Sequence, residues 1–343
     1  MSTSRALSLG TCALGRAIDA CGLPLDGGPR LQGRSVGVAL RPPQPYEREP
    51  ITQPLWTGIR VVDGLLTIGR GARVGIFGAP GAGKTTLLES MVSGCAVDAV
   101  VVALVGERGR EAQRWIEWRN ERTTIVCATG DRSARERLLA AHVAVAHAGA
   151  LRERGLDVLL VLDSLARVAA ALREIGVAAG ESTGRGGYPP SVFAELAKLV
   201  EVAGALHDGS MTLIATVIHD GDDRDPVSEA VRSLLDGHIV LSARLAEGGR
   251  FPAVDVLAST SRTMESVTDE SHRQAAQTLR QALASLNRIE DARSLGIVPA
   301  DGAVRAAIAV EDRLEMFLRQ RARRSDPRTT LSELAEIAAL LQP

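Results

Sequence analysis

The sequence is poor in aromatic residues and has no excess of charge of either sign. Aromatic side chains make up 3% of the 343 residues, which leaves little material for a platform that stacks single-stranded bases. The 40 lysines and arginines nearly balance the 41 aspartates and glutamates, so the net charge is −1. This balance argues against a protein whose main task is to coat nucleic acid or an anionic membrane.

Features of disulfides, metal sites and membrane spans are also missing. The four cysteines, Cys12, Cys21, Cys95 and Cys127, form no C-x-x-C pair, so we expect buried free thiols in a reducing compartment. The histidines lack the spacing of metal ligands. No segment approaches the roughly 18–20 apolar residues that span a bilayer. Because the N-terminus also lacks the apolar region of a signal peptide, we expect a cytoplasmic protein.

From residue 73 onwards, apolar runs of strand length alternate with amphipathic segments. The apolar runs are residues 74–77, 99–105, 124–128, 158–162, 212–218, 238–241 and 253–258. Amphipathic stretches over residues 134–152 and 191–206 predict helices between some of these strands. The alternation predicts an α/β fold with a mostly parallel sheet that is covered by helices on both faces.

The two ends of the chain differ from this core. Residues 1–55 are rich in proline and glycine, which predicts an irregular approach segment. Helical spacing of apolar residues over 271–286, 303–318 and 331–341 predicts a helical C-terminal domain. We therefore expect three parts: an approach segment over residues 1–55, the α/β core over residues 56–267 and a small helical domain over residues 268–343.

One glycine-rich stretch matches the phosphate-binding pattern G-x-x-x-x-G-K-[ST] in full, between a predicted strand and a predicted helix. In such a loop, backbone N–H groups converge on phosphate oxygens at a helix N-terminus. Lys84 is expected to reach the β- and γ-phosphates, and the Thr85 hydroxyl is expected to bind Mg²⁺. The nucleotide-binding residues predicted here are Gly78, Ala79, Pro80, Gly81, Ala82, Gly83, Lys84, Thr85 and Thr86.

Two of the predicted strands are followed by acidic residues. Asp163 comes directly after residues 158–162, at the edge where an α/β sheet binds ligands, and we expect it to help hold Mg²⁺ through water. Glu107 follows residues 99–105, within a Gly-Glu-Arg-Gly-Arg-Glu string. A carboxylate there can orient the water that attacks the γ-phosphate. A solvated charged turn explains the same spacing equally well.

These stretches resemble the catalytic ATPases of type III secretion systems, which are relatives of the flagellar export ATPase and of the F-type ATP synthase β subunit. Further matches cover residues 14–19, 22–27, 55–60, 63–67, 173–176, 187–193, 235–242 and 251–257. The resemblance implies a RecA-like P-loop NTPase core, ATP as the nucleotide and Mg²⁺ as the metal ion.

The same resemblance implies roles near the phosphates. Glu107 matches the catalytic glutamate that orients the attacking water, and Glu111 matches a carboxylate in the shell of water around Mg²⁺. Arg108 and Arg167 match arginines beside the phosphates and the catalytic acids.

Two further residues and one loop match positions away from the phosphates. Phe251 matches an aromatic residue that lies against the adenine, and Arg262 matches an arginine finger that one subunit inserts into its neighbour's site. Residues 221–231 resemble a loop that faces a central stalk protein.

The family also implies an assembly. ATP hydrolysis is expected at the subunit interfaces of a homohexameric ring that energises type III protein secretion by releasing chaperones and unfolding export substrates. The implied partners are the central stalk, a stator or regulator protein and chaperone–effector complexes at the cytoplasmic face of the inner membrane, with no specific nucleic acid. Family members begin with a small β-barrel domain, and this chain starts where that domain should have ended, so a trimmed chain is expected.

Three alternatives remain open. A flagellar export ATPase carries the same motifs, and the loop over residues 79–82 together with the general texture of the sequence favours an injectisome enzyme. An RNA-dependent hexameric translocase shares the core fold, but the chain lacks a nucleic-acid module and is poor in aromatic residues. A non-catalytic ring subunit is disfavoured because Lys84, Glu107 and Asp163 are all present.

Overall fold

The computed structural model describes residues 6–218, 225–294, 301–321 and 324–341, with the backbone alone for residues 218 and 291–294. These residues form two compact units. Unit 1 comprises the described parts of Met1–Ile51, Arg70–Phe77 and Val97–Asp236, and unit 2 comprises those of Thr52–Gly69, Gly78–Ala96 and Gly237–Pro343. The domain boundaries expected near residues 55 and 267 stay predictions.

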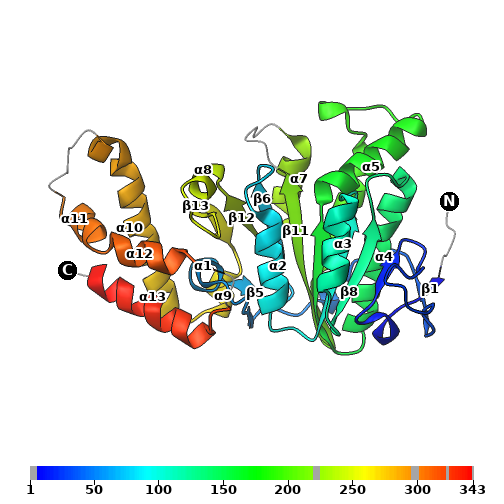
Figure 1. The fold of residues 1–343 in the computed structure, drawn as a ribbon, viewed down its shortest axis with the longest axis horizontal. Helices are drawn as coiled ribbons and strands as arrows, with labels where there is room; N and C mark the ends of the chain where they lie inside the picture. Colours follow the sequence, from blue (N-terminus) through cyan, green and yellow to red (C-terminus); the bar gives the residue numbers. More distant parts are fainter. Residues whose placement is uncertain (1–5, 219–224, 295–300, 322–323, 342–343) are drawn as a thin grey trace. The chain divides into compact units, whose positions relative to one another are not determined.

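Unit 1 is built on a sheet in which the strands follow the order β6-β11-β9-β7-β8-β2 (Figure 1). The neighbours β11–β9, β9–β7, β7–β8 and β8–β2 are parallel, which confirms the predicted mostly parallel sheet. Helix α4 packs along β7, β8 and β9, and every residue of β7 and β8 is buried. The sheet strands are β2 (Ala17–Asp19), β6 (Arg73–Gly78), β7 (Ala99–Val105), β8 (Thr123–Ala128), β9 (Asp157–Asp163), β10 (Gly204–Leu206) and β11 (Gly209–Ile218).

The helices of unit 1 connect these strands. Helix α4 begins with a capping box between Ser133 and Glu136, and α5 begins where the Ser164 side chain accepts a hydrogen bond from the Arg167 amide. The N-termini of both helices are therefore set by the local sequence. The α-helices are α3 (Gly109–Trp118), α4 (Ala134–Arg152), α5 (Leu165–Ala178), α6 (Pro190–Glu201) and α7 (Pro226–Leu234).

Two expectations for unit 1 were wrong. The helix expected over residues 191–206 ends at Glu201, because Gly204–Leu206 forms β10 and pairs antiparallel with the start of β11. The turn between them consists of His207 and Asp208, and Leu206 pairs with Gly209 across it, a two-residue hairpin that the helical spacing obscured. The approach segment is also less irregular than expected, since its strand β2 extends the sheet beside β8 and buries Ala17 and Ile18.

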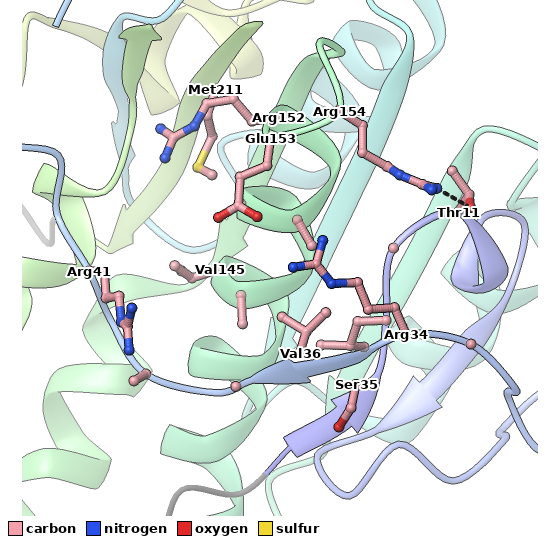
Figure 2. A pocket seen from close by; sticks show the side chains of 18 of the residues that line it. Thr11, Arg34, Ser35, Val36, Arg41, Val145, Arg152, Glu153, Arg154 and Met211 are labelled. Atoms are coloured by element: carbon pink, nitrogen blue, oxygen red, sulfur yellow. Dashed lines mark hydrogen bonds between the residues drawn. The ribbon is translucent and has the colours of Figure 1, made fainter. Parts of the chain in front are cut away.

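The N-terminal segment packs on the C-terminal half of α4, and the two line an open pocket of about 390 Å³ (Figure 2). Its strands β1 (Ala6–Ser8) and β3 (Ser35–Gly37) pair antiparallel beside this cavity. Arg154 spans from the end of α4 to the Thr11 hydroxyl over 2.7 Å. Short 3₁₀ turns are found at Thr11–Ala13, Pro45–Glu47 and, later in the unit, Arg185–Gly187.

Unit 2 joins the antiparallel pair β12–β13 to a cluster of helices. Helix α10 packs against α11 and α13, and α1 contacts α10, α12 and α13 (Figure 1). The elements are β4 (Pro54–Leu55), α1 (Arg60–Leu65), β5 (Ile68–Gly69), α2 (Lys84–Gly94), β12 (Gly237–Leu241), α8 (Ala243–Glu247), β13 (Val254–Ser261), α9 (Met264–Val267), α10 (Glu270–Ser294), α11 (Gly302–Ala309), α12 (Glu311–Leu318) and α13 (Pro327–Leu341). The expected helix over 303–318 is thus two helices that break at Val310.

The core of unit 2 surrounds α1. The Phe317 side chain is buried, and Arg60 lies over its ring at 6.0 Å from the centroid. The buried Asp63 carboxylate accepts hydrogen bonds from the Thr57 amide and hydroxyl and from the Gly58 amide. Burial raises the pKa of Asp63 to about 6, although these donors act in the opposite direction. This carboxylate therefore fastens the segment before α1 to the helix.

The cysteines are free thiols, as expected. Cys95 and Cys127 are buried, whereas Cys12 and Cys21 are half-buried, which corrects the expectation that all four are buried. Within the described ranges, none of the helices combines the length and the apolar character that crossing a membrane requires.

Candidate active site

The glycine-rich loop joins the end of β6 to the start of α2, as predicted. Strand β6 ends at Gly78 and α2 begins at Lys84, so residues 79–83 form the turn. Gly81 has φ +84° and Gly83 has φ +92°, which is a left-handed conformation that favours glycine. The two glycines therefore bend the loop over the N-terminus of a helix of 11 residues.

The loop has the properties that a phosphate group requires. A Cβ atom added at Gly81 or Gly83 would meet no atom within 4 Å, so the space above the backbone is open. The Nζ atom of Lys84 donates hydrogen bonds to the carbonyl oxygens of Gly78 (2.6 Å) and Ala79 (2.8 Å), which keeps the ammonium group at the loop. The amide N–H groups and the ammonium group can donate hydrogen bonds to a phosphate. The Thr85 hydroxyl oxygen is a suitable ligand for Mg²⁺.

The second group of predicted residues lies in unit 1, around Glu107. Glu107 follows β7 and is only 7% exposed, and Arg167 reaches it from the first turns of α5. The Nε atom of Arg167 lies 2.9 Å from Oε1 of Glu107, and Nη2 donates to Oε2 over 3.3 Å. The structure therefore brings together Glu107 and Arg167, which are 60 residues apart in the chain.

The environment of Glu107 favours its protonated form. Burial raises the pKa of Glu107, and Glu111 and Asp163 raise it further through a hydrogen bond and through negative charge. Arg167 lowers the pKa, but it does not outweigh the other three causes. A carboxyl group with a raised pKa is typical of a residue that takes up a proton or orients a nucleophile near neutral pH.

Asp163 ends β9 and is half-buried, in agreement with the predicted position at the carboxyl end of the sheet. The Thr216 hydroxyl donates a hydrogen bond of 2.6 Å to its Oδ1 atom. Thr216 was not singled out from the sequence, although it lies in the predicted strand 212–218. The parallel register, in which Ala215 of β11 lies opposite Leu162 of β9, places Thr216 beside Asp163.

The remaining predicted residues lie at the surface or near it. Arg108 is exposed and Glu111 is half-buried on the first turn of α3. In unit 2, Phe251 is 51% exposed, and Arg262 is exposed directly after β13. Of the predicted stalk-facing loop, residues 221–224 lie outside the described part of the chain.

Two further residues of unit 1, on α4 and α5, were not predicted from the sequence as site residues. Arg137 of α4 and Glu174 of α5 form an ion pair with an N–O distance of 2.7 Å. The side chain of Arg137 also approaches Gly106, the residue before Glu107. Neither was predicted as a site residue, although Glu174 lies within the matched residues 173–176, and the packing of α4 against α5 brings the two together.

The chain resembles known proteins along most of its length. The model of the ATP synthase alpha/beta family, nucleotide-binding domain, matches residues 58–261. A type 3 secretion system ATPase of Xanthomonas euvesicatoria is 45% identical over 324 residues, which are 92% of this chain and 73% of that protein. A flagellum-specific ATP synthase of Salmonella typhimurium is 43% identical and also matches 73% of its own length and 93% of this chain.

A solved structure shows the same fold. It is the assembled ATPase EscN in complex with its central stalk EscO, from the type III secretion system of enteropathogenic E. coli. The TM-score is 0.90 at 38% identity, and the match covers 97% of this chain and 83% of the EscN chain. The likeness thus extends beyond the motifs to nearly the whole described fold.

Proposed function

Because the chain belongs to the type III secretion ATPases within the ATP synthase alpha/beta family, we propose that its glycine-rich loop and its Glu107 cluster act on one ATP molecule. The enzyme hydrolyses ATP and energises type III secretion. The observation that supports the site assignment best is the loop, with two left-handed glycines before α2 and the Lys84 ammonium held at the turn.

In this proposal, each residue has one task. The N-terminus of α2 and Lys84 bind the phosphates. The Thr85 hydroxyl holds Mg²⁺ directly, whereas Asp163 and Glu111 hold it through water. When bound, Mg²⁺ neutralises the charge on the phosphates. Glu107 orients the attacking water, and Arg108 and Arg167 provide positive charge beside the phosphates and the acids. Phe251 packs against the adenine.

Two substitutions test this assignment. Lys84→Ala should abolish hydrolysis and weaken nucleotide binding, because the γ-phosphate loses its main countercharge. Glu107→Gln should keep binding but lose almost all turnover, because the amide cannot act as a base toward water. Binding is measured with a fluorescent nucleotide and turnover by phosphate release. Turnover of Glu107→Gln at the parent rate would show that another residue orients the water.

The assembly is also a proposal. The likeness to the assembled EscN–EscO complex supports a ring, proposed to be a homohexamer, with a central stalk protein as partner. We propose further that the ring works in the cytoplasm at the inner membrane, with a stator protein, and releases chaperones from export substrates. Gel filtration of the chain alone tests whether it forms a ring. Gel filtration with the co-expressed stalk protein of its own system tests whether that protein is a partner.

A flagellar role is the second candidate, because the flagellum-specific relative is nearly as similar as the type 3 secretion system ATPase. The two roles are separated in a strain from which the gene has been deleted. Loss of effector secretion with intact motility supports the injectisome role, and loss of motility alone supports the flagellar one.

A further inference from the structure

The pocket between the N-terminal segment and α4 carries an excess of positive charge. Residues of the stretch 33–41 form one wall, and the end of α4 forms the opposite wall (Figure 2). The charged side chains that line it are Arg34, Arg41, Arg152, Arg154 and Glu153. Four positive charges against one negative charge leave three positive charges here, although the whole chain has a net charge of −1. The pocket is therefore suited to an anion.

Arg152 places one of these charges inside the protein. It is only 8% exposed, and its Nη1 atom donates a hydrogen bond of 2.9 Å to the Val202 carbonyl. Among the described residues, its Nε atom has no hydrogen-bond partner, and the guanidinium forms no ion pair. Burial lowers the pKa of Arg152, although the charge of Glu153 acts in the opposite direction. Because a buried charge without a paired acid is unfavourable, an anion in the pocket would stabilise it.

Two further arginines lie at the rim of the pocket. Arg34 and Arg41 are exposed, and no hydrogen bond or ion pair of either guanidinium is found within the described part of the chain. The backbone of Arg34 is fixed, since its carbonyl accepts a hydrogen bond of 3.3 Å from the Leu9 amide. Figure 2 shows its side chain extending from this wall toward the end of α4. Arg154, by contrast, already donates to the Thr11 hydroxyl.

The size and the floor of the pocket fit a small molecule. Its volume of about 390 Å³ falls in the range of small-molecule sites, roughly 300–1,000 Å³. Four of the lining side chains are buried and apolar: Leu9, Val145, Val202 and Met211. A ligand that fills this space therefore has an anionic group for the arginines and an apolar part for the floor.

The C-terminus of α4 would repel an anion if its carbonyl groups were free, but three of them are occupied. The carbonyl oxygens of residues 149, 151 and 152 accept hydrogen bonds from the amides of residues 153, 154 and 155. The negative end of the helix is thereby partly compensated. The arginine side chains, not these carbonyls, determine the charge that the pocket presents.

We propose that this pocket binds a small molecule that carries a phosphate group. Arg34 binds the phosphate, because a guanidinium can donate two parallel N–H groups to its oxygens. Arg41 and Arg152 add positive charge, and the apolar floor holds the rest of the molecule. Glu153 opposes the binding. Since the pocket lies between the N-terminal segment and α4, its ligand fastens that segment to the helix. This inference does not depend on the proposed ATP site.

Calorimetric titration of the full chain with phenyl phosphate tests the proposal. This probe joins a phosphate group to an apolar ring. Arg34→Gln should raise the Kd about two- to fivefold, as expected for a solvent-exposed charge pair. Arg41→Gln should have a smaller effect in the same direction. Glu153→Gln should lower the Kd, because it removes a negative charge from the lining.

Arg30 provides the matched control. It is an exposed arginine of the same N-terminal segment but does not line the pocket. Arg30→Gln changes the net charge by the same amount as Arg34→Gln and should leave the Kd unchanged. The glycine-rich loop also attracts phosphate, but none of these variants alters it. A difference between the variants therefore reports on this pocket.

Two further measurements identify the ligand chemistry. Benzoate has the same ring with one negative charge and should bind more weakly than phenyl phosphate. Flotation with phosphatidylglycerol vesicles distinguishes a lipid headgroup from a soluble phosphate ester. Capture by the vesicles that is lost in Arg34→Gln indicates a headgroup, whereas phenyl phosphate binding without capture indicates a soluble ester.

Three results would overturn the inference. The first is that phenyl phosphate does not bind. The second is that its Kd is the same in the parent, Arg34→Gln and Glu153→Gln. The third is that benzoate binds as tightly as phenyl phosphate, because the pocket would then not select a phosphate group.

Discussion

The Thr216 hydroxyl donates a 2.6 Å hydrogen bond to Oδ1 of Asp163, from the strand that pairs beside β9. The bond fixes the rotation of the carboxylate and occupies one of its oxygens. We therefore consider Thr216 part of the support of the proposed Mg²⁺ site, although it carries no charge.

Thr216→Val is predicted to weaken the use of Mg²⁺. Valine has nearly the same shape but no hydroxyl, so Asp163 loses a hydrogen bond to a charged group, typically worth about 1.5–3 kcal/mol. We expect at least a roughly tenfold increase in the Mg²⁺ concentration that gives half-maximal ATPase activity. Thr216→Ser keeps the donor and should behave as the parent. An unchanged Mg²⁺ titration in Thr216→Val would contradict this role.

Glu107→Gln is predicted to change how stability depends on pH. In the unfolded chain this carboxyl ionises at an ordinary pKa of about 4.3, but its pKa in the folded chain is raised, chiefly by burial. Between these values the folded state binds more protons, so the free energy of unfolding falls as the pH rises. Glutamine removes this loss.

The difference in Tm, variant minus parent, should therefore increase as the pH is raised from about 4 through the raised pKa, then level off. It is measured by thermal unfolding without nucleotide. Loss of the ion pair with Arg167 changes the Tm of the variant, but it does not change how that Tm depends on pH at low pH. A difference in Tm that is independent of pH would show that Glu107 has an ordinary pKa in the fold.

His147 ties the N-terminal segment to the sheet and is predicted to make it sensitive to acid. Its Nδ1 atom accepts from the Gly10 amide at 3.2 Å, and Nε2 lies 3.0 Å from the Thr124 hydroxyl. That hydroxyl donates to the Ala13 carbonyl over 2.6 Å, so Nε2 must donate to it. The ring is therefore neutral, and protonation of Nδ1 would break the bond to Gly10.

Burial lowers the pKa of His147 from 6.5 to about 4. Between these values the unfolded chain binds the proton and the folded chain does not, so stability falls as the pH falls from 6.5 to 4. The loss should reach about 3 kcal/mol. Glutamine can make both hydrogen bonds without titrating, so urea unfolding of His147→Gln should show a smaller loss over the same pH range. Identical losses would exclude His147 as the cause.

The sequence predicted those parts of the fold whose signal is local. Residues 99–105 and 158–162 are continuous apolar runs because β7 and β9 are buried on both faces. Strand β2 has only three residues, and the burial of its Ala17 and Ile18 depends on its parallel pairing with β8. Such a strand has no periodicity that can be recognised before the partner is known.

The residues of the site also divide into those with a local sequence signal and those without one. Lys84 and Thr85 could be predicted because the phosphate-binding pattern occupies eight consecutive residues. Thr216, Arg137 and Glu174 are ordinary residues of a strand and two helices, and only the register of β11 on β9 and the packing of α4 on α5 give them their partners. Residues that support a site through long-range contacts leave no pattern in a single sequence.

Arg262 is the residue proposed as an arginine finger, and it lies at the surface of the chain. Strand β13 ends at Ser261, so Arg262 follows a regular element directly and is exposed. Within the described part of the chain, no hydrogen bond or ion pair occupies its guanidinium. An arginine supplied in trans to a phosphoryl-transfer site contributes roughly 10³–10⁵ in rate. We therefore expect Arg262→Ala to bind ATP at its own site and to hydrolyse it poorly.

Mixing two inactive variants tests whether Arg262 acts on a neighbouring subunit. Arg262→Ala keeps an intact site, and Lys84→Ala keeps an intact finger, so an interface between them can combine the two intact parts. Random mixing in equal amounts makes about a quarter of the interfaces of a head-to-tail ring competent. Phosphate release should recover to a corresponding fraction of the parent rate after subunit exchange, which is followed separately by energy transfer between labelled chains. If exchange is complete and no activity returns, Arg262 acts within its own subunit, or the ring requires every site to be intact.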